Sequence, residues 1–299
     1  MPNLSLIVPH RGDDARFEET LVAILENRPE ESEVIVVHDG TYQDPYQLGD
    51  EVVFVQTDRR LPLPQLLNEG LMASFAPIIG FVVDGTIVSQ HWADEAVYAL
   101  QDDLDLVSVA IPTESRGQTS FGIDGRSLNN SLRLKKGAIH QHREREVCAS
   151  SGLTCGLFRR SVLLALDGLK GSTLTAAEYD LAVSFSQLGL ESECETEVRV
   201  VYQGPVAAKS DEVRELAEQA AAHGLVAAGW LAALQQAAST MIQSPATAMA
   251  WLSGVRSATE DTQVSRIEKA RERIEQRNEN SVLDASEYFS TSLQNRRAA

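Results

Sequence analysis

Three neighbouring stretches near the start of the chain decide the fold class: residues 3–9 (NLSLIVP), 17–26 (FEETLVAILE) and 33–37 (EVIVV). The first and third are short apolar runs, which is typical of parallel strands covered by helices on both faces. The middle stretch has large apolar residues at helical spacing, namely Phe17, Leu21, Ile24 and Leu25. Strand, helix and strand in this order predict a βαβ unit and therefore an α/β fold.

The second predicted strand ends on His38, Asp39 and Gly40. Parallel sheets bind their ligands just beyond the carboxyl ends of the strands. We therefore expect residues 9–12 and 38–41 to flank one binding site.

The alternation of strand and helix patterns continues almost to residue 203. Strand patterns cover residues 51–56, 77–83, 104–111, 156–158 and 198–202, and helix patterns cover 64–74, 92–100, 161–166 and 176–188. Between residues 112 and 146 the pattern is lost, and the segment is polar and basic. A segment of that length inside a domain is usually functional or mobile.

After about residue 209 the composition shifts to alanine, leucine, glutamine and glutamate, and helices are predicted over 211–222, 225–242, 246–252 and 259–278. We therefore predict two domains, residues 1–209 and a helical C-terminal extension of residues 210–299. The extension could pack on the first domain, pair with another copy of the chain to form a homo-oligomer, or bind a different partner. The sequence leaves these three roles open.

Charge and composition exclude several classes of protein. The formal net charge of −17 argues against nucleic-acid binding, which needs a basic face. No apolar stretch is long enough to span a bilayer, and the first residues lack the features of a signal peptide. The three cysteines are odd in number and form no CxxC pair, which is typical of reduced thiols. Together these observations predict a cytoplasmic location.

Four segments carry a resemblance to a known family. Residues 4–9 (LSLIVP), 17–21 (FEETL), 34–41 (VIVVHDGT) and 68–71 (NEGL) resemble, in this order and spacing, the motifs of glycosyltransferase family 2. A weaker resemblance to the family lies at residues 158–160 (FRR) and 167–169 (DGL). The resemblance covers about residues 3–203. It implies a GT-A fold, that is, a Rossmann-like and mostly parallel sheet flanked by helices, here followed by an all-α C-terminal extension.

The resemblance also implies a function. Family members move a sugar from a nucleotide-linked donor to an acceptor, with inversion at the anomeric carbon. The expected ligands are therefore a UDP- or GDP-linked sugar and a hydroxyl group of a glycan or other acceptor. The donor site would include Pro9, His10 and Arg11 after the first strand, Asp39 after the second, and Asn68 and Asp84. For Asp39 the sequence also permits a simpler role, because an Asp-Gly pair commonly caps a turn.

The expected metal site departs from the family pattern. Residues 81–92 (FVVDGTIVSQHW) lie over the family's Asp-x-Asp segment, so that Val83 and Gly85 take the two aspartate positions and Asp84 lies between them. Consecutive strand residues point to opposite faces, so we expect Asp84 to point away from the metal position. Asp84 alone would bind Mg²⁺ or Mn²⁺ weakly. Basic residues could neutralise the leaving diphosphate instead, and the candidates are Arg59, Arg60, Lys135, Lys136, Arg143 and Arg145.

The expected catalytic base is also altered. Residues 177–183 (AEYDLAV) resemble the family's acidic motif, with Glu178 at the position usually assigned as the base and Asp180 at the following acidic position. The alternative role for Glu178 is to complement the first turn of its helix. Two functions therefore remain open: an active glycosyltransferase, or an inactive GT-A-like domain that serves as a binding or scaffolding module through its helical C-terminus.

Overall fold

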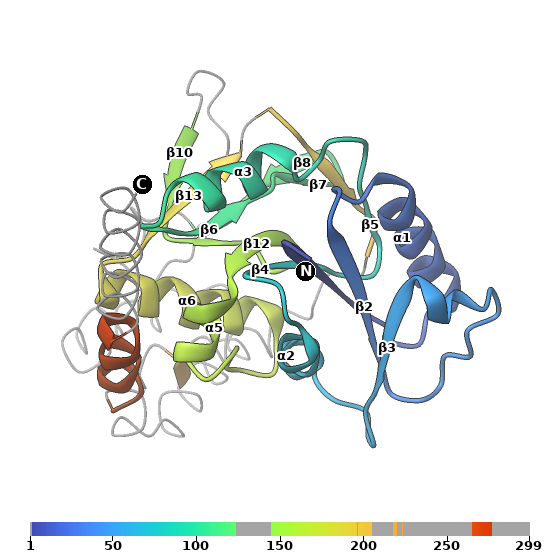
Figure 1. The fold of residues 1–299 in the computed structure, drawn as a ribbon, viewed down its shortest axis with the longest axis horizontal. Helices are drawn as coiled ribbons and strands as arrows, with labels where there is room; N and C mark the ends of the chain where they lie inside the picture. The colour runs from blue at the N-terminus through green and yellow to red at the C-terminus, as the bar shows by residue number, and fades with distance from the viewer. Residues whose placement is uncertain are drawn as a thin grey trace, which may run out of the picture.

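A computed structural model describes residues 2–123, 145–195, 197–204, 218–219, 223 and 265–276. Its centre is an eight-stranded sheet (Figure 1). In spatial order the strands are β10 (Arg145–Cys148), β13 (Glu191–Glu195), β6 (Leu106–Ala110), β12 (Cys155–Arg159), β4 (Ile78–Val82), β1 (Leu4–Pro9), β2 (Ser32–His38) and β3 (Val52–Gln56).

The sheet is mostly parallel. The pairs β4–β1, β1–β2, β2–β3 and β13–β6 are parallel, whereas β12 runs antiparallel to both of its neighbours and β10 runs antiparallel to β13. This confirms the predicted α/β class and the mostly parallel sheet. The carboxyl ends of β1, β2 and β4 therefore meet at one edge, where the sequence predicts a ligand site.

Helices cover both faces of the sheet. The helices are α1 (Asp14–Asn27), α2 (Leu63–Ala73), α3 (Asp94–Asp102), α5 (Arg160–Ala165) and α6 (Leu174–Leu188), with a short 3-10 turn η1 (Leu48–Asp50) before β3. One apolar cluster joins α1 and α3 to one face, and a second joins α2, α5 and α6 to the other. Figure 1 shows α3 and the α5–α6 pair on opposite sides of the central strands.

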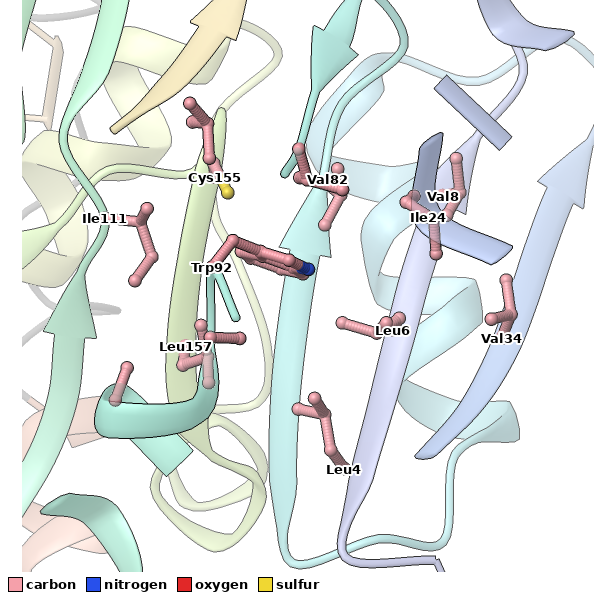
Figure 2. Close-up of a cluster of buried hydrophobic side chains, with 14 of the residues drawn as sticks. Leu4, Leu6, Val8, Ile24, Val34, Val82, Trp92, Ile111, Cys155 and Leu157 are labelled. Atoms are coloured by element: carbon pink, nitrogen blue, oxygen red, sulfur yellow. The ribbon is translucent and has the colours of Figure 1, made fainter. Parts of the chain in front are cut away.

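The alternation of side chains along β1 divides these two clusters. Leu4, Leu6 and Val8 face the α1–α3 side, and Ile7 faces the α2–α6 side, with all four fully buried. On the α1–α3 side the Trp92 indole packs close to Val82 of β4 and Leu157 of β12 (Figure 2). Burial on both faces explains why the strands appear in the sequence as continuous apolar runs.

Two small sheets lie outside the central sheet. The larger has the order β5 (Thr86–Ile87), β14 (Val200–Tyr202), β7 (Thr113–Ser115) and β8 (Gln118–Ser120), and the smaller pairs β11 (Ser150–Ser151) with β9 (Gly122–Ile123). The last predicted strand, residues 198–202, is thus present as β14, but it belongs to the larger of these two small sheets. The sequence did not indicate β13.

Most of the predicted C-terminal extension lies outside the described residues, including the predicted domain boundary near residue 209. Within the predicted helix 259–278, residues 265–276 are helical. Ile267 and Ala270 of this helix are buried in the same apolar cluster as Phe185 of α6, and Figure 1 shows the helix in red beside α6. Among the described helices, none is both long and apolar enough to cross a membrane.

Candidate functional site

Polar side chains gather at the carboxyl edge formed by β1, β2 and β4. The backbone N–H of His10 donates to the Val37 carbonyl oxygen at 2.8 Å, which continues the β1–β2 pairing past Pro9. Asp39 follows β2, and Asp84 follows β4 by two residues. The parallel register therefore brings the expected donor-site residues of three strands to one edge.

Arg11 and Asp84 form an ion pair across this edge. Arg11 Nε donates to Asp84 Oδ1 at 2.5 Å, and the side chain of Asp84 is 2% exposed whereas that of Arg11 is 26% exposed. Burial alone would lower the pKa of Arg11, but the charge and hydrogen bond of Asp84, with a contribution from Tyr202, raise it above its ordinary value. Arg11 is therefore a permanent cation at this position.

Gly85 is enclosed by its neighbours. It has φ +95°, and a Cβ atom there would lie 2.8 Å from both Arg16 Cδ and the backbone nitrogen of Gly204. The backbone is held further by Gln203 N–H, which donates to the Gly85 carbonyl at 2.8 Å, and by Gly85 N–H, which donates to Thr20 Oγ1 at 2.8 Å. The second aspartate position of the family pattern has no room for a side chain.

These observations do not fit a divalent cation at the end of β4. Mg²⁺ and Mn²⁺ need several oxygen ligands, and the Asp84 carboxylate already accepts from Arg11. Within the parts of the chain that are described, no cluster of three or more His, Cys, Asp or Glu side chains is arranged to hold a metal ion.

Aromatic side chains pack around His10, which follows β1. His10 is 1% exposed, and its Nε2 lies 2.7 Å from Asp14 Oδ1. The ring centroid of His10 lies 5.0 Å from that of Phe17 and 5.2 Å from that of Tyr42. His10 Nδ1 and the Tyr42 hydroxyl are buried and have no hydrogen-bond partner among the described residues.

His38 and Tyr42 complete this group. Burial, and secondarily the nearby His10, lowers the pKa of His38. Burial raises the pKa of Tyr42 to about 12, and its ring stacks on Phe54 with centroids 6.2 Å apart. The sequence patterns did not single out Tyr42. Its position two residues after Gly40, in the loop expected to border a nucleoside, was the available signal.

Asp39 holds the turn after β2. Its Oδ1 accepts from the Thr41 hydroxyl at 2.6 Å and from the Thr41 N–H at 3.2 Å. The hydrogen bond from the Thr41 side chain is the main reason that the pKa of Asp39 lies below its ordinary value. Asp39 thus has the turn-capping role that the sequence allowed, and contact with a nucleoside stays a prediction.

Asn68 fixes a loop on the α2 side of the sheet. Its Nδ2 donates to the Leu169 carbonyl oxygen at 3.0 Å, and its Oδ1 accepts from the Leu169 N–H at 2.8 Å. Both ends of the amide therefore bind the chain just before α6. Asn68 therefore holds this loop in place, and its contact with the donor stays a prediction.

Glu178 is 3% exposed and lies in the second turn of α6. Its Oε1 accepts from the Leu153 N–H at 2.8 Å. The next residue, Thr154, accepts through its carbonyl oxygen from the Val83 N–H at 2.9 Å. A loop of three residues, 152–154, therefore joins Glu178 to the end of β4 where Asp84 lies.

Asp180 is fully buried and binds the C-terminal part of the chain. It accepts two hydrogen bonds of 2.9 Å from Arg266 Nη1 and lies 2.9 Å from His223 Nε2. Burial alone would raise the pKa of Asp180, but the His223 hydrogen bond and the Arg266 charge hold it below its ordinary value. Arg266 also donates to the backbone carbonyls of Leu166 and Gly168.

The structure thus gathers five predicted residues at one edge: Pro9, His10, Arg11, Asp39 and Asp84. Glu178 is connected to that edge by one loop, whereas Asn68 and Asp180 make their described contacts on the α2–α6 side. The sequence did not indicate the Arg266–Asp180 pair, because its partners are separated by 86 residues. A basic residue within a mixed-charge helix gives no signal of burial.

The fold is similar to the GT-A fold of solved glycosyltransferases. Solved structures similar to this chain include GalNAc-T7 with UDP, GalNAc and Mn²⁺ (TM-score 0.53, 13% identity, 75% of this chain and 51% of that one). They also include the mannosyltransferase PcManGT of Pyrobaculum calidifontis in complex with GDP-Man and Mn²⁺ (TM-score 0.50, 15% identity, 97% and 80%). A third is S. aureus TarS 1–349 (TM-score 0.52, 14% identity, 74% and 64%).

These likenesses show the fold alone, because each identity is 15% or lower. The chain matches about half the length of the GalNAc-T7 chain and just under two thirds of the TarS fragment. Neither a protein-family model nor a curated protein matches the chain by sequence.

Proposed function

We propose that this protein transfers a sugar from a UDP- or GDP-linked donor to a hydroxyl group of a glycan or other acceptor. Two findings support the proposal: a GT-A fold, and polar residues gathered at the carboxyl ends of β1, β2 and β4. In open α/β sheets this edge is the usual place for a nucleotide. Arg11 and Asp39 are the charged donor-site residues, and the buried aromatic ring of Tyr42 lies beside the proposed nucleoside position.

The observation that carries the proposal is the link between Glu178 and the end of β4. Leu153 N–H binds Glu178, and the neighbouring Thr154 carbonyl accepts from Val83 N–H. Through this loop, one buried carboxylate is tied to the strand end that carries the donor-site residues. Such a fixed carboxylate beside a donor site suits a general base.

The proposed reaction is a single displacement. The acceptor hydroxyl oxygen forms the new bond to the anomeric carbon as the bond from that carbon to the diphosphate oxygen breaks. The hydroxyl proton passes to the Glu178 carboxylate, and the nucleoside diphosphate leaves with the electron pair of the broken bond. Attack from the face opposite the leaving group inverts the anomeric carbon.

A second candidate function is favoured by a specific observation. Asp180 is engaged by Arg266 and His223, and Oε1 of Glu178 already accepts from Leu153. The acidic motif could therefore serve only to hold α6, its preceding loop and the C-terminal helix together. In that case the chain is an inactive GT-A-like domain that acts as a binding or scaffolding module through its C-terminal helices.

A donor-hydrolysis assay distinguishes the two functions. Many transferases slowly pass the sugar to water, so release of UDP or GDP from common nucleotide sugars can be measured without knowing the acceptor. We expect release by the wild type and a loss of about 100-fold or more in Glu178→Gln, which keeps an oxygen to accept from Leu153 N–H. Glu69→Gln, which changes an exposed carboxylate on α2, is the matched control.

Full activity in Glu178→Gln would rule out Glu178 as the base. No release from any donor by folded wild-type protein, with mono- and disaccharide acceptors added, would favour the inactive binding module.

A further inference from the structure

We propose that the donor site holds its diphosphate without a divalent cation, through the guanidinium of Arg11, and that Asp84 is the residue that positions this guanidinium. The inference rests on the proposed function, because it names what binds the diphosphate of the same donor. It differs from the family expectation, in which a metal on two aspartates does this work.

The first step is the orientation of the Arg11–Asp84 pair. The carboxylate is 2% exposed and the arginine side chain 26% exposed, so the anion lies behind the cation as seen from solvent. A ligand that approaches the strand edge therefore meets the positive partner. Asp84 accepts a hydrogen bond from Arg11 Nε–H, which is one of the five N–H donors of a guanidinium.

The second step concerns the hydrogen-bonding capacity at the edge. The terminal nitrogen Arg11 Nη2 is buried and has no hydrogen-bond partner by geometry among the described residues, although Tyr202 lies near enough to the guanidinium to help raise its pKa. Nδ1 of the adjacent His10 is also buried and has no hydrogen-bond partner among the described residues. Buried polar groups in folded proteins are nearly always satisfied, so two such atoms on consecutive residues point to a missing polar ligand.

The third step concerns the position of the metal. Gly85 cannot carry a side chain, because a Cβ there would meet Arg16 Cδ and the Gly204 backbone at 2.8 Å. Two arginines, Arg11 and Arg16, thus border this turn, and the nearby carboxylates are already paired, Asp84 with Arg11 and Asp13 with Arg16. A dication placed here would be repelled by two guanidinium groups and would lack ligands.

The fourth step is chemical. A guanidinium binds phosphate oxygens through two parallel N–H donors, and it keeps its charge at any physiological pH. The charge that develops on a departing diphosphate can therefore be stabilised by Arg11, provided that the side chain is held in place before the reaction. The hydrogen bond from Arg11 Nε–H to Asp84 holds the side chain in place. The two terminal nitrogens, at the far end of the guanidinium, are then left for the diphosphate.

Calorimetric titration with UDP and GDP tests this inference, first in EDTA and then in Mn²⁺. The variant is Arg11→Gln combined with Asp84→Asn, because removal of Arg11 alone would leave a buried carboxylate unpaired and could prevent folding. Arg11→Lys keeps the charge without the fork. Arg28→Gln is the matched control, since Arg28 is also a partly exposed arginine in an ion pair, with Glu51, and it lies at the C-terminal end of α1.

We expect the wild type to bind one of the nucleotides with dissociation constants in EDTA and Mn²⁺ that agree within about twofold. The double variant should bind at least about tenfold more weakly, Arg11→Lys should fall between the two, and Arg28→Gln should match the wild type. Binding that requires Mn²⁺, or unchanged binding in the double variant, overturns this inference and leaves the proposed function standing. No binding of UDP or GDP under either condition overturns the proposed function itself.

Discussion

Gly85 shows how one residue can exclude a metal site. Its backbone lies at φ +95° and is pressed against Gly204 and Arg16, so the loss of the expected aspartate is enforced by packing. The sequence shows the glycine but not the crowding. The crowding comes from Arg16 of α1 and from Gly204, which follows β14, the strand that pairs with β5.

A substitution at this position can be predicted. Gly85→Ala combines a positive φ with a steric overlap, so we expect it to lower the free energy of unfolding by about 2–4 kcal/mol. Gly12→Ala is the matched control, because Gly12 has φ +92° and a Cβ atom there would meet nothing within 4 Å. Gly12→Ala should lower the free energy of unfolding through backbone strain alone, by about 1–2 kcal/mol. Urea unfolding measures both, and equal losses would show that Gly85 is not crowded.

Asp84 illustrates why the direction of a single side chain was hard to predict. The prediction that it points away from the metal position assumed strand alternation through residue 84, and it stays a prediction. However, β4 ends at Val82, and a turn follows. In a turn the two-residue period no longer applies, and the carboxylate turns to Arg11 on the opposite loop. The composition of both loops was visible in the sequence, but their pairing across 73 residues was not.

At the scale of elements, α6 and the helix of residues 265–276 are joined by a buried ion pair. Arg266 binds the Asp180 carboxylate and two carbonyls of the loop before α6, while Arg273 binds Asp167 of that loop at 2.7 Å. The described C-terminal helix is therefore in direct contact with the acidic motif that the sequence associated with catalysis.

The energy of this pair can be measured. Arg266→Met removes the charge that compensates the buried Asp180 carboxylate, and we expect it to destabilise the protein by about 3–5 kcal/mol. Asp180→Asn in the same chain should restore much of that loss, because the buried charge is then gone. A double-mutant cycle with urea unfolding gives the coupling energy. Additive losses would mean that the two side chains do not interact.

Periodicity located most elements, since the predicted and observed bounds of β1, α1, β2, β3, α2 and β4 differ by three residues or fewer at either end. It failed for β13, whose sequence ESECE alternates small buried residues with glutamates and so lacks the usual apolar signal. It also could not assign β14 to a sheet, because strand partners are a property of the whole fold.

At the scale of the whole molecule, the sequence resemblance and the solved structures agree on a GT-A fold at identities of 13–15%. Such likeness indicates where a ligand site should lie, but the groups within it are those of this chain. Here those groups are an arginine–aspartate pair, a cluster of aromatic side chains and a buried glutamate. The central claim is therefore that a nucleoside diphosphate binds at the ends of β1, β2 and β4.

Hydrogen exchange of the full chain, with and without saturating UDP or GDP, tests this claim most directly. Bound nucleotide should slow the exchange of backbone amides in residues 10–12, 38–42 and 83–86, because these loops border the proposed site. Amides of α3, on the α1–α3 face of the sheet, should exchange as before. Unchanged exchange in all three loops, or protection confined to other parts of the chain, would contradict the account.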